Sequence, residues 1–206
     1  MGKTKATARE RTLEIVTVVV LSITAVLTAG CGFESSQWGG EESIAFSQAS
    51  AARIESSSAD SRAQSARQYD LSVYIEWVRA QNAGDAKLAS YIEQRFSPEF
   101  RVAFDAWMAG GQKQLGPFRT ASYVPPGTAE AKALNAKADA KFQQALVYNT
   151  YGDRYSLLTV LFALVLFLTA ISQRELRPWM QYTFLALALV AGLAAVILML
   201  TFPIDV

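Results

Sequence analysis

Histidine is absent from this chain of 206 residues, and cysteine occurs only once. A chain without histidine lacks the commonest metal ligand and the side chain that most often serves as a base near neutral pH. A single thiol cannot form an internal disulfide. The sequence therefore excludes histidine-based zinc sites and Ser-His or Cys-His catalytic pairs within this chain. We assign no catalytic, cofactor-binding or metal-binding residue and expect no enzyme.

Charge is also scarce, since only 18% of the residues are charged and the net charge is +1. Residues 33–154 carry 13 basic and 14 acidic side chains, so this region is close to neutral. A nucleic-acid binder needs a concentrated basic surface to neutralise phosphates. We therefore expect no nucleic-acid partner.

Apolar residues are instead concentrated in three blocks, 13–31, 155–172 and 180–202. The second and third contain no ionisable side chain other than tyrosine, and each approaches or exceeds the roughly 20 residues that cross a bilayer as a helix. The first block is slightly short for a span. The sequence predicts three transmembrane helices, with the lipid bilayer as a partner, and a domain formed by residues 32–154.

Positive charge in the short segments predicts the orientation. Lys and Arg prefer the cytoplasmic side of a membrane. The tail 1–12 is basic, and the loop 173–179 holds Arg174 and Arg177, whereas the tail 203–206 has neither Lys nor Arg. We expect the N-terminus and this loop in the cytoplasm, and the domain and the C-terminal tail outside it.

The end of the first block allows three interpretations. Leu27-Thr28-Ala29-Gly30-Cys31 resembles a bacterial lipobox, in which the leader is removed and the cysteine is lipidated. Thr28 stands where Leu is usual, and the basic leader is long. The first interpretation is an uncleaved membrane anchor. The alternatives are lipidation at Cys31 or cleavage by an ordinary signal peptidase.

Small residues with heptad spacing mark the segment after the first span. No proline occurs between residues 35 and 83, and charged residues such as Arg53 and Glu55 lie off the repeat. Steps of four and three place the small residues on one helix face. We call this face the ascending seam, and it comprises Ala45, Ala49, Ala52, Ser56, Ala59, Ala63, Ala66 and Asp70.

A second small-residue row predicts the return helix, with Thr128 as its N-cap: Ala129, Ala133, Ala136 and Ala140. Between the two rows, residues 85–96 and 98–108 read as amphipathic helices whose aromatics should pack on Val73, Tyr74, Trp77 and Val78. We predict an all-α membrane protein with three transmembrane helices and a long extracytoplasmic antiparallel helical hairpin that ends in a small helical tip. Each seam could serve the hairpin alone or also dock a partner.

Two further features have alternative interpretations. Asp70 is an unusual residue for a seam; it is either a buried polar contact that fixes register or a partly solvated carboxylate near Arg67. In the third span, small residues favour close helix packing, either with the second span or with another subunit. These residues are Ala188, Ala191, Gly192 and Ala195.

The layout resembles an uncharacterised family of small bacterial membrane proteins with three spans. The resemblance lies in the basic leader, in Ser36-Gln37-Trp38 within an Ala/Gln/Ser-rich helical region, and in Gly152-Asp153-Arg154-Tyr155 entering the second span. It implies the bacterial cytoplasmic (inner) membrane and supplies no activity or catalytic residues. Residues 85–127 depart from the compact pattern of that family.

Together these features favour a structural or interaction protein that forms oligomers or serves as an accessory subunit of a larger membrane complex. The first alternative is a homo-oligomeric channel or transport component. The absence of Asp, Glu, Lys, Arg and His from the second and third spans argues against a pump, because coupled transport places such groups there. The second alternative is an extracytoplasmic sensor module.

Overall fold

The computed structural model describes residues 8–174 and 177–204, and these are all helices, turns and loops. The basic residues Lys3 and Lys5 of the predicted tail lie outside this description. The chain divides into two compact units. Unit 1 contains residues 1–46 and 142–206, and unit 2 contains residues 47–141. The all-helical class predicted from the sequence is confirmed for the described residues.

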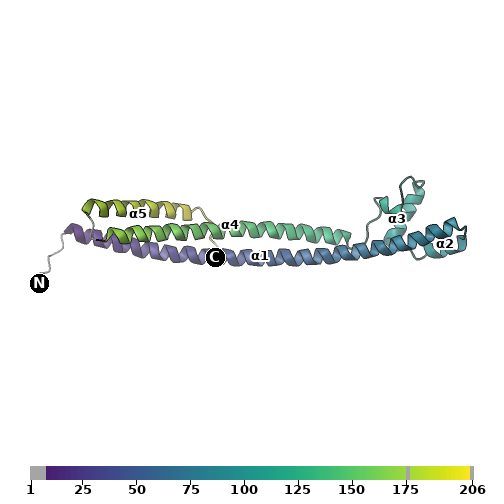
Figure 1. Ribbon diagram of the computed structural model, residues 1–206, viewed down its shortest axis with the longest axis horizontal. Helices are drawn as coiled ribbons and strands as arrows, with labels where there is room; N and C mark the ends of the chain where they lie inside the picture. The colour runs from purple at the N-terminus through teal and green to yellow at the C-terminus, as the bar shows by residue number, and fades with distance from the viewer. Residues whose placement is uncertain (1–7, 175–176, 205–206) are drawn as a thin grey trace. The chain divides into compact units, whose positions relative to one another are not determined.

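Two long helices supply most of the structure (Figure 1). Helix α1 is continuous from Ala8 to Asn82, and α4 from Thr128 to Ser172. No proline interrupts either range, so no backbone N–H is missing from the helical hydrogen-bond ladder. Each helix therefore joins an apolar block to a segment of the domain without a break.

Helix α4 begins one residue differently from the sequence prediction. Thr128 is its first residue, not its N-cap, and the carbonyl of Gly127 accepts a hydrogen bond from the Ala131 amide at 2.8 Å. Gly127 has a φ of +97°, which favours glycine, and Pro125 and Pro126 precede it. The turn chemistry at Gly127 thus determines where the helix starts.

Short helices fill the segment between the long ones. Helix α2 spans Ala86–Glu93, and its N-cap Asp85 accepts from the Leu88 amide at 2.9 Å. Helix α3 spans Pro98–Ala109 and is capped by Ser97, which accepts from the Phe100 amide at 3.1 Å. A 3₁₀ helix, η1, covers Pro117–Arg119 within the loop that leads to α4. These caps agree with the two amphipathic helices expected here.

Helix α5 spans Pro178–Met199 and completes unit 1, where it runs alongside α4 (Figure 1). Three helices, α1, α4 and α5, are long and apolar enough to cross a membrane. We call the parts of these helices that lie in the apolar blocks 13–31, 155–172 and 180–202 the candidate spans. A buried cluster ties the three together: Cys31 and Trp38 from α1, Tyr155, Leu158 and Phe162 from α4, and Ala195 from α5.

Candidate interaction surfaces

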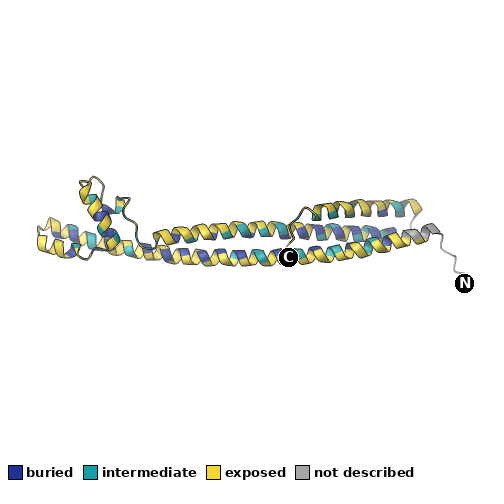
Figure 2. Cartoon of the chain, turned by 180° about the vertical axis from the view of Figure 1, so that it is seen from behind, coloured by how far each residue is buried: buried dark blue, intermediate teal, exposed yellow. Residues whose placement is uncertain are grey.

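The ascending seam is occupied within the chain itself. Seven of its eight residues are buried, and Ala66 is half-buried. The pattern is visible as dark blue residues that recur along α1 (Figure 2). Ala52 and Ala59 retain 2% and 0% of their accessible surface, so no second protein can contact them without opening the fold. The seam serves packing inside the molecule.

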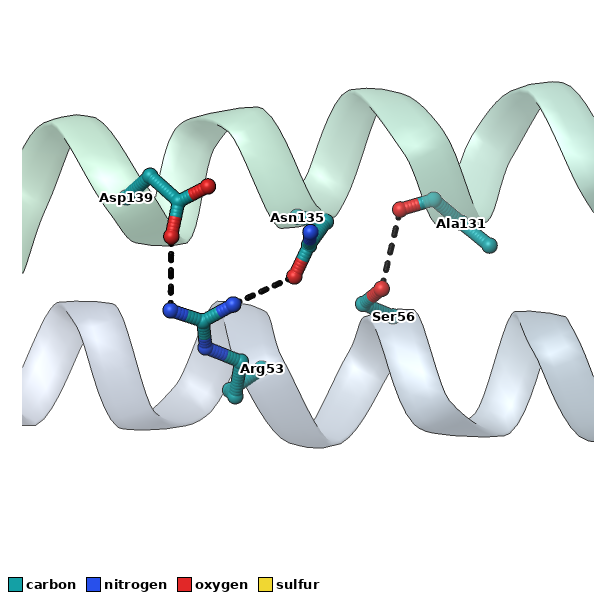
Figure 3. Close-up of polar contacts among 5 residues, drawn as sticks. All are labelled: Arg53, Ser56, Ala131, Asn135 and Asp139. Carbon is teal, nitrogen blue, oxygen red and sulfur yellow. Dashed lines mark hydrogen bonds and ion pairs between the residues drawn. The ribbon is translucent and has the colours of Figure 1, made fainter.

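In unit 2, α1 and α4 are linked by side-chain contacts that define an antiparallel register (Figure 3). The Ser56 hydroxyl donates to the Ala131 carbonyl at 2.8 Å in a buried position. Arg53 donates to Asn135 Oδ1 at 2.5 Å and to Asp139 Oδ1 at 2.7 Å. As the residue number rises along α1, it falls along α4. The two helices therefore run in opposite directions in this unit.

These contacts contribute different amounts to the stability of the helix pair. The side chains of Arg53 and Asp139 are 52% and 60% exposed, and exposed ion pairs typically add about 0–1 kcal/mol. The pair Arg62–Glu130, at 2.6 Å, is similarly exposed. Ser56 is buried, so losing its acceptor would leave an unpaired polar group at a cost of about 1–3 kcal/mol. Alanine packing and Ser56 therefore fix the register, and the ion pairs reinforce it.

The return row predicted from the sequence is wrong as a packed seam. Ala129, Ala133, Ala136 and Ala140 are all exposed, and the buried alanines of α4 are Ala131, Ala138 and Ala145. Both sets have heptad spacing, so small size alone does not distinguish them. The register fixed by the buried Ser56 contact turns the second set toward α1.

We expect this register to be measurable by enlarging one alanine in each set. Leucine at Ala138, which is fully buried, should overpack the helix pair and cost about 1–3 kcal/mol. Leucine at Ala136, which is exposed, should change the free energy of unfolding by less than about 0.5 kcal/mol. Amide hydrogen exchange of unit 2 in the full chain gives the comparison. A larger effect at Ala136 would show that the predicted row is the packed one.

A polar groove lies beside the Ser56 contact and has a volume of about 480 Å³. Its lining includes Arg53, Asp60, Lys132 and Asn135. Arg53 is paired with Asp139, and Asp60 accepts from Gln64 at 2.7 Å. The lining thus carries two basic groups and one acidic group, and Asp139, which lies outside the lining, offsets the charge of Arg53.

Sequence reasoning missed the group formed by Arg53, Asn135 and Asp139. Asn135 and Asp139 are four residues apart on α4 and so share one helix face. At that spacing, an amide oxygen and a carboxylate oxygen can both accept hydrogen bonds from one arginine guanidinium. This pattern on α4 is the sequence signal by which the group could be predicted.

The second structural cluster of unit 2 is aromatic. Phe100 is fully buried, and its ring centroid lies 4.8 Å from those of Phe96 and Phe118. Tyr74 stacks on Trp77 at 5.9 Å, and the Trp77 indole N–H donates to Glu93 Oε1 at 2.8 Å. Phe96, which lies between α2 and α3, and the α3 aromatics Phe100 and Phe104 pack on α1 as expected from the sequence, whereas Tyr91 of α2 is exposed.

Asp70 lies at the edge of this aromatic cluster and is 1% exposed. The Tyr123 hydroxyl donates to Asp70 Oδ2 at 2.9 Å, while Oδ1 is buried with no hydrogen-bond partner in the described part of the chain. The interpretation of a partly solvated carboxylate is therefore wrong, and Asp70 is a buried polar contact. It joins α1 to the loop before α4, across 53 positions of sequence.

The Tyr123–Asp70 contact makes stability depend on pH. Burial raises the pKa of Tyr123 above its ordinary value, and the hydrogen bond to Asp70 and the charge of Asp70 raise it further, with Arg67 opposing. A raised pKa stabilises the fold below the unfolded value near 10, and this contribution is lost as pH rises through the folded value. We expect the free energy of unfolding to fall above about pH 10.

Tyr123→Phe provides the control for this prediction. Phenylalanine cannot ionise, so the variant should lose less stability between about pH 10 and 12 than the parent, with tryptophan fluorescence of Trp77 and Trp107 as the readout. Equal slopes in the two proteins would contradict the coupling.

In unit 1, the small residues of α5 face the chain's own helices. Ala188 and Ala195 are fully buried, and Ala191 and Gly192 are half-buried. A Cβ on Gly192 would lie 3.6 Å from a methyl of Val165 on α4. These residues bring α5 close to α4, as the intramolecular interpretation of the small-residue row expects. An apolar groove of about 250 Å³ remains beside them, between α1, α4 and α5.

Cys31 is fully buried inside the same unit. Its Sγ lies 4.0 Å from the Met199 sulfur, and it belongs to a cluster with Trp38 and Tyr155. Helix α1 passes through this position without interruption. With α1 intact, the Cys31 thiol is therefore enclosed by the helices of unit 1.

The described residues contain no group of three or more Cys, Asp or Glu side chains arranged to hold a metal ion. No family model, curated protein or solved structure matches the chain. The packing surfaces are therefore the features of this chain that bear on its function.

Proposed function

We propose that this chain is a membrane-anchored structural protein that acts by assembly, either with copies of itself or as an accessory subunit of a larger membrane complex. The observation that supports the proposal is that the interior of unit 2 is filled by side chains that pack helices together, whereas the candidate spans expose apolar side chains on their outer surface. The interior of unit 2 consists of small side chains, aromatic rings and a few hydrogen bonds, all of which hold helices together. The exterior of the spans is apolar.

The outward side chains of the candidate spans support a lipid environment. Val26, Val160 and Val190 are 72%, 65% and 69% exposed on α1, α4 and α5. Apolar surface on this scale is costly in water at about 25 cal/mol per Å² but costs nothing in hydrocarbon. We propose that all three helices cross the bacterial inner membrane, with residues 32–154 outside the cytoplasm.

We also propose that the first helix is retained as an anchor. Burial of Cys31 against Met199 supports retention, because lipidation requires an accessible thiol and removal of the helix would expose the cluster around Trp38. Intact mass of the purified protein decides this point. A mass that matches a chain starting at Cys31 with added acyl groups would contradict retention.

An amine-reactive crosslinker that cannot cross membranes tests the proposal in intact cells. The exposed Lys132 and Lys137 lie in the region we place outside the cytoplasm. We expect a covalent adduct of defined mass that contains two or more chains, or this chain with a partner. Reaction of these lysines without any adduct would contradict assembly, and failure of the lysines to react would contradict the orientation.

A further inference from the structure

A cavity of about 280 Å³ lies in unit 2, between the end of α3 and the loop that leads through η1 to α4. Small-molecule sites typically have volumes of about 300–1,000 Å³, so this cavity is close to the lower end of that range. One water molecule takes about 30 Å³ in the liquid, so the cavity has room for about nine or ten non-hydrogen atoms. It can therefore hold a small organic molecule.

Hydrogen bonds within the loop hold the walls of this cavity. The Trp107 indole N–H donates to the carbonyl oxygen of Gln114 at 2.9 Å. The Thr120 hydroxyl donates to the Pro117 carbonyl oxygen at 2.8 Å, and Pro117 is buried. Trp107, Gln114 and Thr120 all line the cavity, so its shape is formed before any ligand arrives.

The end of α3 forms one wall and has its carbonyl groups satisfied. The carbonyl oxygens of Ala106 and Trp107 accept from the amides of Gly110 and Gln112 at 3.0 Å and 3.1 Å. Gln112 has a φ of +57°, which is uncommon for a residue other than glycine. The negative end of a helix dipole comes from unsatisfied carbonyl groups. Closing these carbonyls reduces the repulsion that an anion in the cavity would otherwise meet.

Lys113 carries the only charge in the lining. No Asp or Glu occurs between Asp105 and Glu130. Within the part of the chain that the structure describes, Lys113 forms no ion pair or hydrogen bond, and the side-chain amide of Gln114 has no partner either. An ammonium and an amide N–H that line one cavity are suitable donors for a carboxylate.

Trp107 supplies an aromatic wall. On one side its ring packs against the aromatic cluster, with centroids 6.2 Å from Tyr74 and 6.0 Å from Phe104. The side chain is only half-buried, and the remaining surface is accessible from the cavity. Ala106 and Ala121 also line the cavity and leave room beside the indole. A planar ring can therefore pack against Trp107.

We propose that this cavity, which we call the tip site, binds a small aromatic carboxylate. The ring of the ligand packs on Trp107, and its carboxylate accepts hydrogen bonds from the Lys113 ammonium and the Gln114 amide. A neutral amide of the same shape loses the ion pair, and an amine places a second cation beside Lys113. The tip site adds a ligand-binding function to unit 2 that depends neither on assembly nor on orientation in the membrane.

Three probes that share one ring test the proposal: benzoate, benzamide and benzylamine. Each is titrated near neutral pH against the full chain in lipid nanodiscs, with empty nanodiscs as the blank, and saturation-transfer NMR of the probe measures binding. We expect benzoate to bind at least about tenfold more tightly than benzamide, because its hydrogen bonds are charge-assisted. Benzylamine should show no saturable binding. Equal affinities for benzoate and benzamide, or no saturable binding of benzoate, would overturn the tip site.

Two variants alter the tip site at exposed positions, and each has a control outside the lining. Lys113→Gln removes the charge, with Lys87→Gln on α2 as its control, and Ala121→Leu fills the cavity, with Ala136→Leu on α4 as its control. We expect Lys113→Gln and Ala121→Leu each to weaken benzoate binding by about tenfold or more and the controls to leave it within about twofold. Amide hydrogen exchange of α3 verifies that each variant is folded.

The variants also locate the site. Unchanged benzoate affinity in both Lys113→Gln and Ala121→Leu, with α3 still protected, would show that benzoate binds elsewhere and would overturn the tip site. The result is separate from the proposed assembly. A chain that forms crosslinked adducts without binding benzoate loses only the tip site, and one that binds benzoate but never forms an adduct loses only the assembly.

Discussion

Phe100→Ala is expected to open the aromatic cluster of unit 2. Phe100 is fully buried and contacts five other rings: Tyr74, Phe96, Phe104, Phe118 and Tyr123. Removing a buried phenylalanine ring typically costs about 3–5 kcal/mol, because the lost transfer free energy adds to the cost of the cavity. The amides of α2 and α3 should then exchange about 100-fold to 4,000-fold faster, since each 1.4 kcal/mol is a factor of ten.

Val102→Ala is the matched control on the same helix. Val102 is 58% exposed and packs little, so its truncation should change the protection of α3 by less than about 0.5 kcal/mol. Hydrogen exchange with mass spectrometry on the full chain in nanodiscs measures both variants under identical conditions. Similar exchange rates for the two variants would mean that the aromatic cluster does not stabilise this region.

Gly127→Ala is expected to disrupt the start of α4. The new Cβ would lie 2.4 Å from the Ala59 carbonyl oxygen of α1, a distance that backbone atoms cannot accommodate without moving. Its φ of +97° adds strain of about 1–3 kcal/mol for a non-glycine residue. We expect a total loss of more than about 2 kcal/mol, with faster exchange at Ala131 and its neighbours because the Ser56 contact loosens.

Gly84→Ala distinguishes the clash from the backbone strain. Gly84 also has a positive φ, +71°, but a Cβ there meets nothing within 4 Å. This variant should lose only about 1 kcal/mol from the strained backbone. A comparable loss at both glycines, measured by thermal unfolding, would indicate that Gly127 does not pack against α1 as described.

The ascending seam could be found from the sequence because two signals coincide there. Small residues such as Ala52 and Ala59 recur at the same heptad positions, and charged residues such as Arg53 do not occupy those positions. The return row could not be found in the same way, since exposed and buried alanines both repeat on α4. Bulky residues carry the missing information: Tyr148, Tyr155 and Phe162 continue the packed phase at seven-residue steps.

Contacts that join distant positions are harder to predict. Asp70 was recognisable as an anomaly because a carboxylate in a packed row requires a partner. Its partner, Tyr123, lies in an irregular loop whose path depends on η1 and on the close approach of Gly127 to α1. No periodicity runs through that loop, so spacing alone could not identify the tyrosine.

We propose above that this chain works by assembly in a membrane. The most direct test is native mass spectrometry of the full chain released from lipid nanodiscs that were prepared from its own membrane without detergent. We expect complexes that contain two or more copies, or one copy with a partner at fixed stoichiometry. Single chains alone, at every lipid-to-protein ratio and with no co-purifying protein, would contradict it.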